Sequence, residues 1–129
     1  MPTIVHFDLP GEDLLRAKKF YSELFGWKLI APPGFPDYYL IETTDLEGKP
    51  ATGGGIGKRG SPDQRIMKYI GIPSIDEYSA KVKHLGGSLI LPKMAVPGFG
   101  FLAICTDTEG NTFGLWQEDL GAQESGSEP

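Results

Sequence analysis

Two stretches of the chain carry apolar residues at the spacing of an amphipathic helix. Steps of three and four residues place side chains on one face of a helix. One stretch begins at Leu14 and the other at Ile75, and both repeat the same steps of 3, 4 and 3. The apolar positions are Leu14, Ala17, Tyr21 and Leu24 in the first stretch, and Ile75, Tyr78, Val82 and Leu85 in the second. The pattern predicts one helix in each half of the chain.

Local signals mark the ends of these two helices. Gly26 follows the first apolar stretch and Gly86 with Gly87 follows the second, and glycine readily adopts the left-handed conformation that ends a helix. Ser74 and Glu77 have the spacing of a capping box, in which each side chain satisfies the free backbone N–H of the other residue. The second helix is therefore expected to begin just after Ser74.

The segments around the helices also match each other in order. A strand-like run ends at Pro10 before the first helix and at Pro73 before the second, and after each helix a short β-prone run stops at Pro32 or Pro92. Each half then has a Pro-Gly-Phe that opens a strand and a polar turn that precedes a last strand. These matches are Pro33–Phe35 with Pro97–Phe99, and Asp45–Gly48 with Asp107–Gly110. Matching positions lie 60 to 64 residues apart, which indicates an internal repeat.

Each half thus has the order strand, helix, strand, strand, strand. We predict an α+β fold in which two tandem β-α-β-β-β units form a curved mixed sheet around a cleft, because one face of each sheet has no helix to cover it. The first unit spans about residues 3–60 and the second about 65–118, within one domain over residues 1–120. Residues 121–129 are small, polar and acidic, and we expect a disordered tail there.

Composition and charge narrow the class of protein. With 129 residues, of which 40% are hydrophobic and 22% charged, the chain fits one globular domain. A net charge of −5 argues against a nucleic-acid partner, which requires a basic face. No stretch has the pattern of a signal peptide or a membrane span, and the single Cys105 excludes an intramolecular disulfide. We therefore expect a cytoplasmic protein with no membrane contact, in which Cys105 is a buried thiol.

Two long segments carry a resemblance to a known superfamily. The opening segment is HFDLPGEDLLRAKKFYSELFGWKL, and the closing segment is GGSLILPKMAVPGFGFLAICTDTEGNTFGLWQ. They resemble the first and second units of the vicinal oxygen chelate superfamily, which includes glyoxalase I, bleomycin-resistance proteins, fosfomycin-resistance enzymes and extradiol dioxygenases. The resemblance covers roughly residues 3–118 and is closest to short bacterial and archaeal glyoxalase-like proteins. It implies the same duplicated fold.

The resemblance also implies a place for a divalent metal, with one ligand from the first strand and one from the last strand of each unit. His6 occupies the first-strand position of the first unit, and Tyr69 the equivalent position of the second. The last strands supply Thr52 or Gly53–Gly55 in the first unit, and Gly114 in the second. Because a divalent ion needs several nitrogen or oxygen donors, and a neutral phenol is a poor one, we expect no four-ligand metal centre and no cofactor.

An alternative stays open, in which His6 binds zinc, nickel, iron or manganese together with other ligands. Asp8 lies two residues after His6 and so points to the same face of the strand, and Glu42 could reach the cleft from the third strand. Such a centre would make the protein a metal-dependent lyase or dioxygenase. In a metal-free enzyme, His6 would instead be the general base and Asp8 would orient its ring.

Alternation along the strands predicts the lining of the cleft. Either Tyr38 or Tyr39 is expected to join His6 there, and the glycines of the last strands are expected to leave room. The candidate substrate-binding residues are His6, Asp8, Tyr38, Glu42, Tyr69, Gly114 and Trp116. An aromatic pocket with one histidine and one or two carboxylates suits a flat or amphipathic small molecule.

Three functions are therefore compared. The leading hypothesis is a small-molecule-binding protein of the glyoxalase/bleomycin-resistance group without the usual metal centre. The second is the metal-dependent lyase or dioxygenase described above, and the third is a protein-association module with a vestigial cleft. Members of the superfamily commonly form homodimers, and exposed sheet edges lead to the same expectation here.

Overall fold

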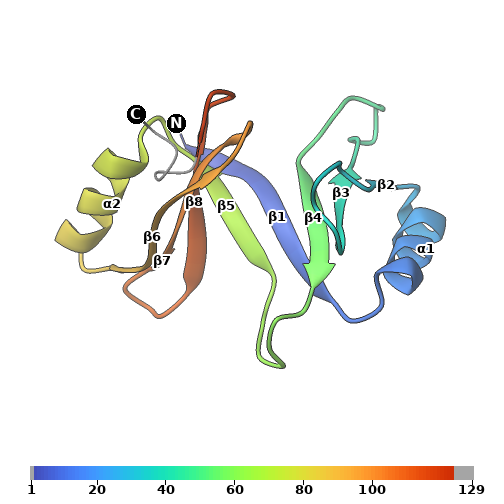
Figure 1. Ribbon diagram of the computed structural model, residues 1–129, viewed down its shortest axis with the longest axis horizontal. Coiled ribbons are helices and arrows are strands. Elements are labelled where there is room, and N and C mark those ends of the chain that lie inside the picture. The colour runs from blue at the N-terminus through green and yellow to red at the C-terminus, as the bar shows by residue number, and fades with distance from the viewer. Residues whose placement is uncertain (1, 124–129) are drawn as a thin grey trace. The chain divides into compact units, whose positions relative to one another are not determined.

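The computed structural model describes residues 2–123, which divide into two compact units. The N-terminal unit comprises Val5–Lys68, and the C-terminal unit comprises the chain from Tyr69 onward together with the residues before Val5. Figure 1 traces both, and each has the order strand, helix, strand, strand, strand. The predicted α+β fold with two β-α-β-β-β units is confirmed.

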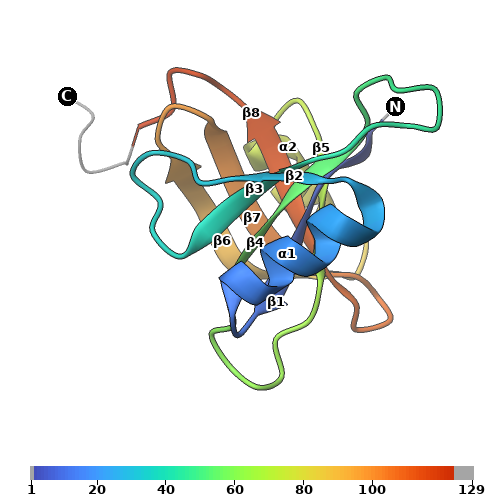
Figure 2. The same cartoon turned by 90° about the vertical axis from the view of Figure 1, so that its right-hand side faces the viewer.

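In the N-terminal unit, one helix lies against one face of four strands (Figure 2). The strands lie in the order β2-β3-β4-β1, with β1 parallel to β4 and the other pairs antiparallel. The elements are β1 (Thr3–Gly11), α1 (Leu14–Phe25), β2 (Lys28–Ile30), β3 (Tyr38–Glu42) and β4 (Gly53–Lys58). Apolar residues of α1 and the strands form the core, with Leu14, Leu29, Ile41 and Ile56 buried.

The C-terminal unit repeats this arrangement. Its strands lie in the order β5-β8-β7-β6, with β5 parallel to β8 and the other pairs antiparallel. The elements are β5 (Met67–Gly71), α2 (Ile75–His84), β6 (Ser88–Val96), β7 (Gly100–Thr106) and β8 (Thr112–Glu118). Its core buries Ile72, Ile75, Ala103, Cys105 and Leu115. The two units therefore share both strand order and strand direction, as the internal repeat predicts.

The helical spacing predicts the two helices correctly but fails at the last apolar position of each. Leu14 and Ile75 are buried, whereas Leu24 and Leu85 are 57% and 71% exposed. Leu24 lies in the last turn of α1, and Leu85 follows α2 as its cap, so the strands no longer cover these positions. Neither helix in the described part of the chain is long and apolar enough to span a membrane.

The predicted helix ends are also observed. The Ser74 side chain accepts a hydrogen bond of 3.2 Å from the Glu77 backbone N–H, and α2 begins at the next residue. Gly26 ends α1 in the left-handed conformation, with φ of 71°. The first helix has a cap that the sequence analysis missed, since the Asp13 carboxylate accepts from the Arg16 backbone N–H at 3.0 Å. Both helices thus begin with a side-chain acceptor for an otherwise unpaired donor.

The prediction that a strand stops at Pro92 is wrong. Strand β6 continues through Pro92 to Val96. Its register against β7 shifts between Leu89 and Leu91 and again between Leu91 and Met94, the interval that contains Pro92. Because β6 has a neighbouring strand on one side only among residues 2–123, a residue without an N–H can remain within it. Pro32, in contrast, does lie outside the short strand β2.

Residues 121–123 also differ from the sequence prediction, which placed them in a disordered tail. Ala122 is 4% exposed, and its carbonyl accepts a hydrogen bond of 3.1 Å from the Gly98 N–H. The small side chain fits against the turn between β6 and β7, so composition alone was misleading here. Residues 124–129 of the predicted tail lie outside the described part of the chain.

Candidate functional site

Strand β1 divides its side chains between two environments. Phe7 and Leu9 pack into the core under α1. Since successive side chains of a strand point to opposite faces, His6 and Asp8 lie on the face turned away from α1. Both side chains are 30% exposed, so a dissolved molecule can reach them. The predicted placement of His6 and Asp8 on one face is therefore confirmed.

Three side chains of this face form a closed hydrogen-bonded cluster. His6 Nε2 lies 2.9 Å from Asp8 Oδ1, and the Tyr38 hydroxyl donates to the same oxygen at 2.7 Å. The Tyr38 hydroxyl is also 3.2 Å from His6 Nε2. The structure thereby decides between the two candidate tyrosines, because Tyr39 packs into the core beside α1.

The contacts within this cluster assign a role to each atom. An ionised Asp8 can only accept hydrogen bonds, so the Tyr38 hydroxyl and the His6 Nε2–H both act as donors toward it. In a neutral imidazole, a proton on Nε2 leaves the lone pair on Nδ1. An ionised Asp8 therefore orients the ring of His6 and favours the tautomer that carries its proton on Nε2. Such a group can accept a proton or a hydrogen bond from a bound molecule.

The glycines of the last strands lie beside these residues in register. His6 pairs with Gly53 and Asp8 with Gly55 across β1 and β4. A Cβ at Gly55 would collide with the hydroxyl and ring of Tyr38. The sequence analysis expected these glycines to leave open room, and at Gly55 that expectation is wrong, because the tyrosine fills the space.

The C-terminal unit contains the equivalent pair. Tyr69 pairs with Gly114 across β5 and β8, and a Cβ at Gly114 would collide with the Tyr69 ring. Leu115 is buried in the core, so Gly114 and Trp116 lie on the opposite face of β8, as alternation predicts. Tyr69, Gly114 and Trp116 therefore share a face within their own unit, while His6, Asp8 and Tyr38 belong to the other unit.

The side chains present do not fit the metal centre considered as the alternative. No group of three or more His, Cys, Asp or Glu side chains within residues 2–123 is arranged to hold a metal ion. Glu42, the proposed extra ligand, is exposed at the end of β3 and does not belong to the hydrogen-bonded cluster. At the strand positions beside His6 and Tyr69, Gly53 and Gly114 provide no side-chain donor.

Cys105 lies apart from this cluster, in the core of the C-terminal unit. Its side chain is fully buried among Ile75, Ala103 and Leu115. Burial raises the pKa of the Cys105 thiol because the charged thiolate is poorly solvated there. The thiol therefore stays protonated at neutral pH and serves packing, as the sequence predicts.

Duplicated β-α-β-β-β units, with first and last strands parallel and adjacent, define the vicinal oxygen chelate class of protein. A family model described as bleomycin resistance protein-like N-terminal matches residues 3–44. A glyoxylase-like domain-containing protein of Didymella fabae is 30% identical over 115 residues, covering 84% of this chain and 88% of that protein. The chain belongs to the glyoxalase-like proteins of the vicinal oxygen chelate superfamily.

Longer proteins also match this chain. CFP32 of Mycobacterium tuberculosis, whose name assigns it to the glyoxylases, is 31% identical over 115 residues. The anthracycline biosynthesis protein DnrV of Streptomyces peucetius is 27% identical over 136 residues. The matches cover 85% and 93% of this chain, but only 43% and 49% of those proteins. The chain therefore spans about half the length of these curated relatives.

Solved structures support the fold. Methylmalonyl-CoA epimerase of Streptomyces coelicolor superposes with a TM-score of 0.70 at 12% identity, covering 94% of this chain and 97% of that one. A hypothetical protein of Bacillus halodurans gives a TM-score of 0.68 at 17% identity, covering 95% and 99%. At these identities the likeness concerns the fold alone.

Proposed function

We propose that this protein binds a small organic molecule at the cluster of His6, Asp8 and Tyr38, without a four-ligand metal centre. One observation carries the proposal: His6, at the position of a metal ligand in the superfamily, is hydrogen-bonded to Asp8 and lies within 3.2 Å of Tyr38. The adjacent strand position is Gly53, which has no donor side chain. In this proposal, protein groups orient the histidine.

The chemistry of the cluster indicates what kind of molecule it would bind. It presents an imidazole, a carboxylate and a phenol, so a ligand with a carbonyl or hydroxyl group next to a flat or apolar part would match it. The names of two similar proteins mention organic compounds of this general kind. One of the Streptomyces epimerase structures contains 2-nitronate-propionyl-CoA, and DnrV is named for anthracycline biosynthesis.

The same contacts favour a second function, metal-free proton transfer. The Asp8 carboxylate holds the His6 ring through Nε2, so Nδ1 is the atom that would take a proton from a bound molecule. Asp8 would then stabilise the positive imidazolium that forms. This role needs no group beyond those in the N-terminal unit.

Metal analysis tests the absence of a metal centre. The protein is purified without chelator, and zinc, nickel, iron and manganese are measured in the unmodified chain and in His6→Ala. We expect well under one equivalent of each metal in both proteins. One equivalent of metal that is lost in His6→Ala, but kept in the matched control His84→Ala, would contradict the proposal.

A binding experiment tests the cluster itself. An anthracycline and methylmalonyl-CoA are titrated into the 15N-labelled protein, and amide shifts are followed by NMR. We expect saturable shifts around β1 and β3 with at least one probe, and roughly tenfold weaker binding in His6→Ala and Tyr38→Phe. Tyr39→Phe, which removes a hydroxyl outside the cluster, is the control. Equal binding by all four proteins would assign the site elsewhere.

A further inference from the structure

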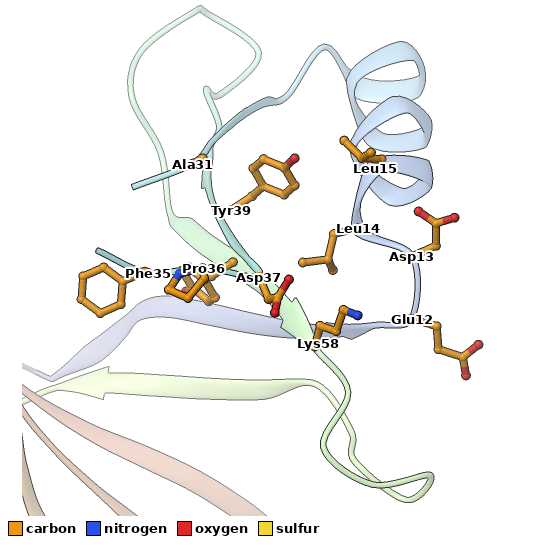
Figure 3. Close-up of a pocket in the computed structure, with 11 residues that line it drawn as sticks. Glu12, Asp13, Leu14, Leu15, Ala31, Phe35, Pro36, Asp37, Tyr39 and Lys58 are labelled. Atoms are coloured by element: carbon orange, nitrogen blue, oxygen red, sulfur yellow. The ribbon is translucent and has the colours of Figure 1, made fainter. Parts of the chain in front are cut away.

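A hollow lies in the N-terminal unit, beside α1 (Figure 3). Its volume is about 490 Å³, within the range of roughly 300–1,000 Å³ usual for small-molecule sites. Leu14 of α1 and Tyr39 of β3 contribute to its lining, and both pack on the core side of the sheet. His6 and Asp8 point to the opposite face, so this hollow is distinct from the candidate site, although Tyr38 borders both.

Apolar surface forms much of the lining of the hollow. Leu14 and Leu15 come from the first turn of α1, while Phe35 and Pro36 come from the segment between β2 and β3. Leu15 is 71% exposed and Phe35 is 37% exposed. These side chains offer a contact surface to an apolar part of a ligand.

Asp37 and Lys58 line the hollow and carry opposite charges, but their side chains do not form an ion pair with each other. The Lys58 backbone N–H donates to the Asp37 carbonyl at 3.4 Å, so Asp37, just before β3, lies beside Lys58 at the end of β4, as Figure 3 shows. Nevertheless, neither side chain forms an ion pair within residues 2–123.

The other two charges at the hollow are already engaged. Glu12 lies 4.0 Å from Arg59, and Asp13 caps α1 through the Arg16 N–H. The hollow therefore offers one carboxylate and one ammonium, at Asp37 and Lys58, to a ligand.

We propose that this hollow binds an α-amino acid with an apolar side chain. The ammonium of the ligand would pair with Asp37, its carboxylate with Lys58, and its side chain would lie on Leu15 and Phe35. A plain amine would leave Lys58 without an anion, and a plain carboxylate would face Asp37 and Glu12. A zwitterion matches both charges, whereas a ligand with a single charge leaves one of them without a partner.

Truncated ligands give the first test. L-leucine is titrated into the 15N-labelled protein beside 3-methylbutylamine, which lacks the carboxylate, and 4-methylpentanoate, which lacks the ammonium. We expect saturable amide shifts at the hollow with L-leucine and at least roughly tenfold weaker binding of the other two. The proposal is overturned if L-leucine gives no saturable shift at about 50 mM, where even a millimolar site is full, or if either truncated compound binds equally well.

Two substitutions give the second test. Asp37 has φ of 57°, a left-handed conformation that asparagine tolerates, so Asp37→Asn removes the charge and keeps the backbone. Lys58→Met removes the ammonium and keeps an unbranched side chain. Each change is expected to weaken L-leucine binding roughly tenfold, while charge removals at two residues that do not line the hollow, Asp63→Asn and Lys83→Met, leave it unchanged. Unaltered binding in both Asp37→Asn and Lys58→Met would refute the assignment.

Discussion

Tyr38 and Gly55 show how one residue without a side chain shapes the candidate site. The Tyr38 ring lies over Gly55, in the space that a Cβ at this position would require. From there its hydroxyl reaches Asp8 at 2.7 Å. The hydrogen bonds that orient His6 therefore require the contact between the Tyr38 ring and Gly55. A substitution at Gly55 would displace the Tyr38 ring.

Gly55→Ala tests this dependence. The added methyl would displace the Tyr38 ring, and we expect the free energy of unfolding to fall by about 1–3 kcal/mol, as for overpacking. The hydrogen bonds of Tyr38 should be lost, which is measured by urea unfolding and by NMR contacts between Tyr38 and His6. Repeating the change in a Tyr38→Ala background should remove most of the cost, since the collision is then absent. An equal cost in both backgrounds would place the strain elsewhere.

Cys105 gives a prediction with a defined pH dependence. Burial raises its pKa in the folded protein, so the folded state holds the thiol proton more tightly than the unfolded state does. Below the unfolded pKa of about 8.5 both states are protonated and pH has no effect through this group. Above it, the unfolded state loses protons first, and the free energy of unfolding should fall as pH rises.

The measurement compares the unmodified protein with Cys105→Ala by urea unfolding between about pH 7 and pH 10, a range that spans the thiol pKa of about 8.5. The variant should be less stable at neutral pH, because it leaves a small cavity among Ile75, Ala103 and Leu115. The difference between the two proteins should then shrink at high pH. A difference that stays constant over the whole range would show that the thiol does not titrate differently in the two states.

At the scale of elements, the repeated polar turns are the clearest equivalence between the two units. Asp45 Oδ1 accepts from the N–H groups of Glu47 and Lys49 at 2.8 and 2.9 Å. Asp107 Oδ1 accepts from the residues two and four positions later at the same distances. Gly48 and Gly110 close the turns with φ of 87° and 82°. In each unit, one aspartate and one glycine thus stabilise the turn that precedes the last strand, β4 or β8.

Asp107→Ala removes the acceptor of two backbone N–H groups. We expect the free energy of unfolding to fall by about 1–3 kcal/mol, because these donors lose a charge-assisted partner. Asp107→Asn keeps an oxygen at the same position and should recover most of the loss. Chemical unfolding of both variants provides the comparison. If alanine and asparagine were equally destabilising, the charge and not the hydrogen bonds would carry the effect.

The sequence predicts most elements because their signals are local. Apolar spacing and capping residues locate both helices, and the aspartate turns are visible as a repeated motif. Pro92 was misinterpreted because a proline is compatible with a strand that has one neighbour, and neighbours are set by the whole sheet. Leu24 and Leu85 were misplaced for the same reason, since spacing alone does not show where the covering strands end.

The candidate site was predictable only in part. The spacing of His6 and Asp8 places them on one face, but Tyr38 and Tyr39 are adjacent, and only the register of β3 against β4 separates them. The hollow at Asp37 and Lys58 carried no sequence signal, because it depends on where two strand ends meet. The choice of Tyr38 and the position of the hollow depend on pairing between strands that are distant in the sequence. The spacing of apolar residues gives no information about that pairing.

At the scale of the whole molecule, the outer edge of β6 is the surface on which homodimer formation is expected. This strand has nine residues and, in the described part of the chain, one neighbouring strand, so its second edge offers backbone groups for pairing. Ile90 and Met94 along it are 57% and 46% exposed. Pro92 and the register shifts interrupt the edge, which limits pairing to short segments and favours a closed dimer over open-ended association.

Sedimentation equilibrium tests this expectation against concentration. The unmodified protein should approach twice the chain mass of 14.0 kDa, and Ile90→Lys should shift it toward the monomer, because a charge on an edge strand opposes pairing. Leu46→Lys, at an equally apolar but fully exposed turn position, should leave the dimer intact. A monomer at every concentration would contradict dimer formation. If Ile90→Lys still forms a dimer, the protein does dimerise, but the interface does not lie at the edge of β6.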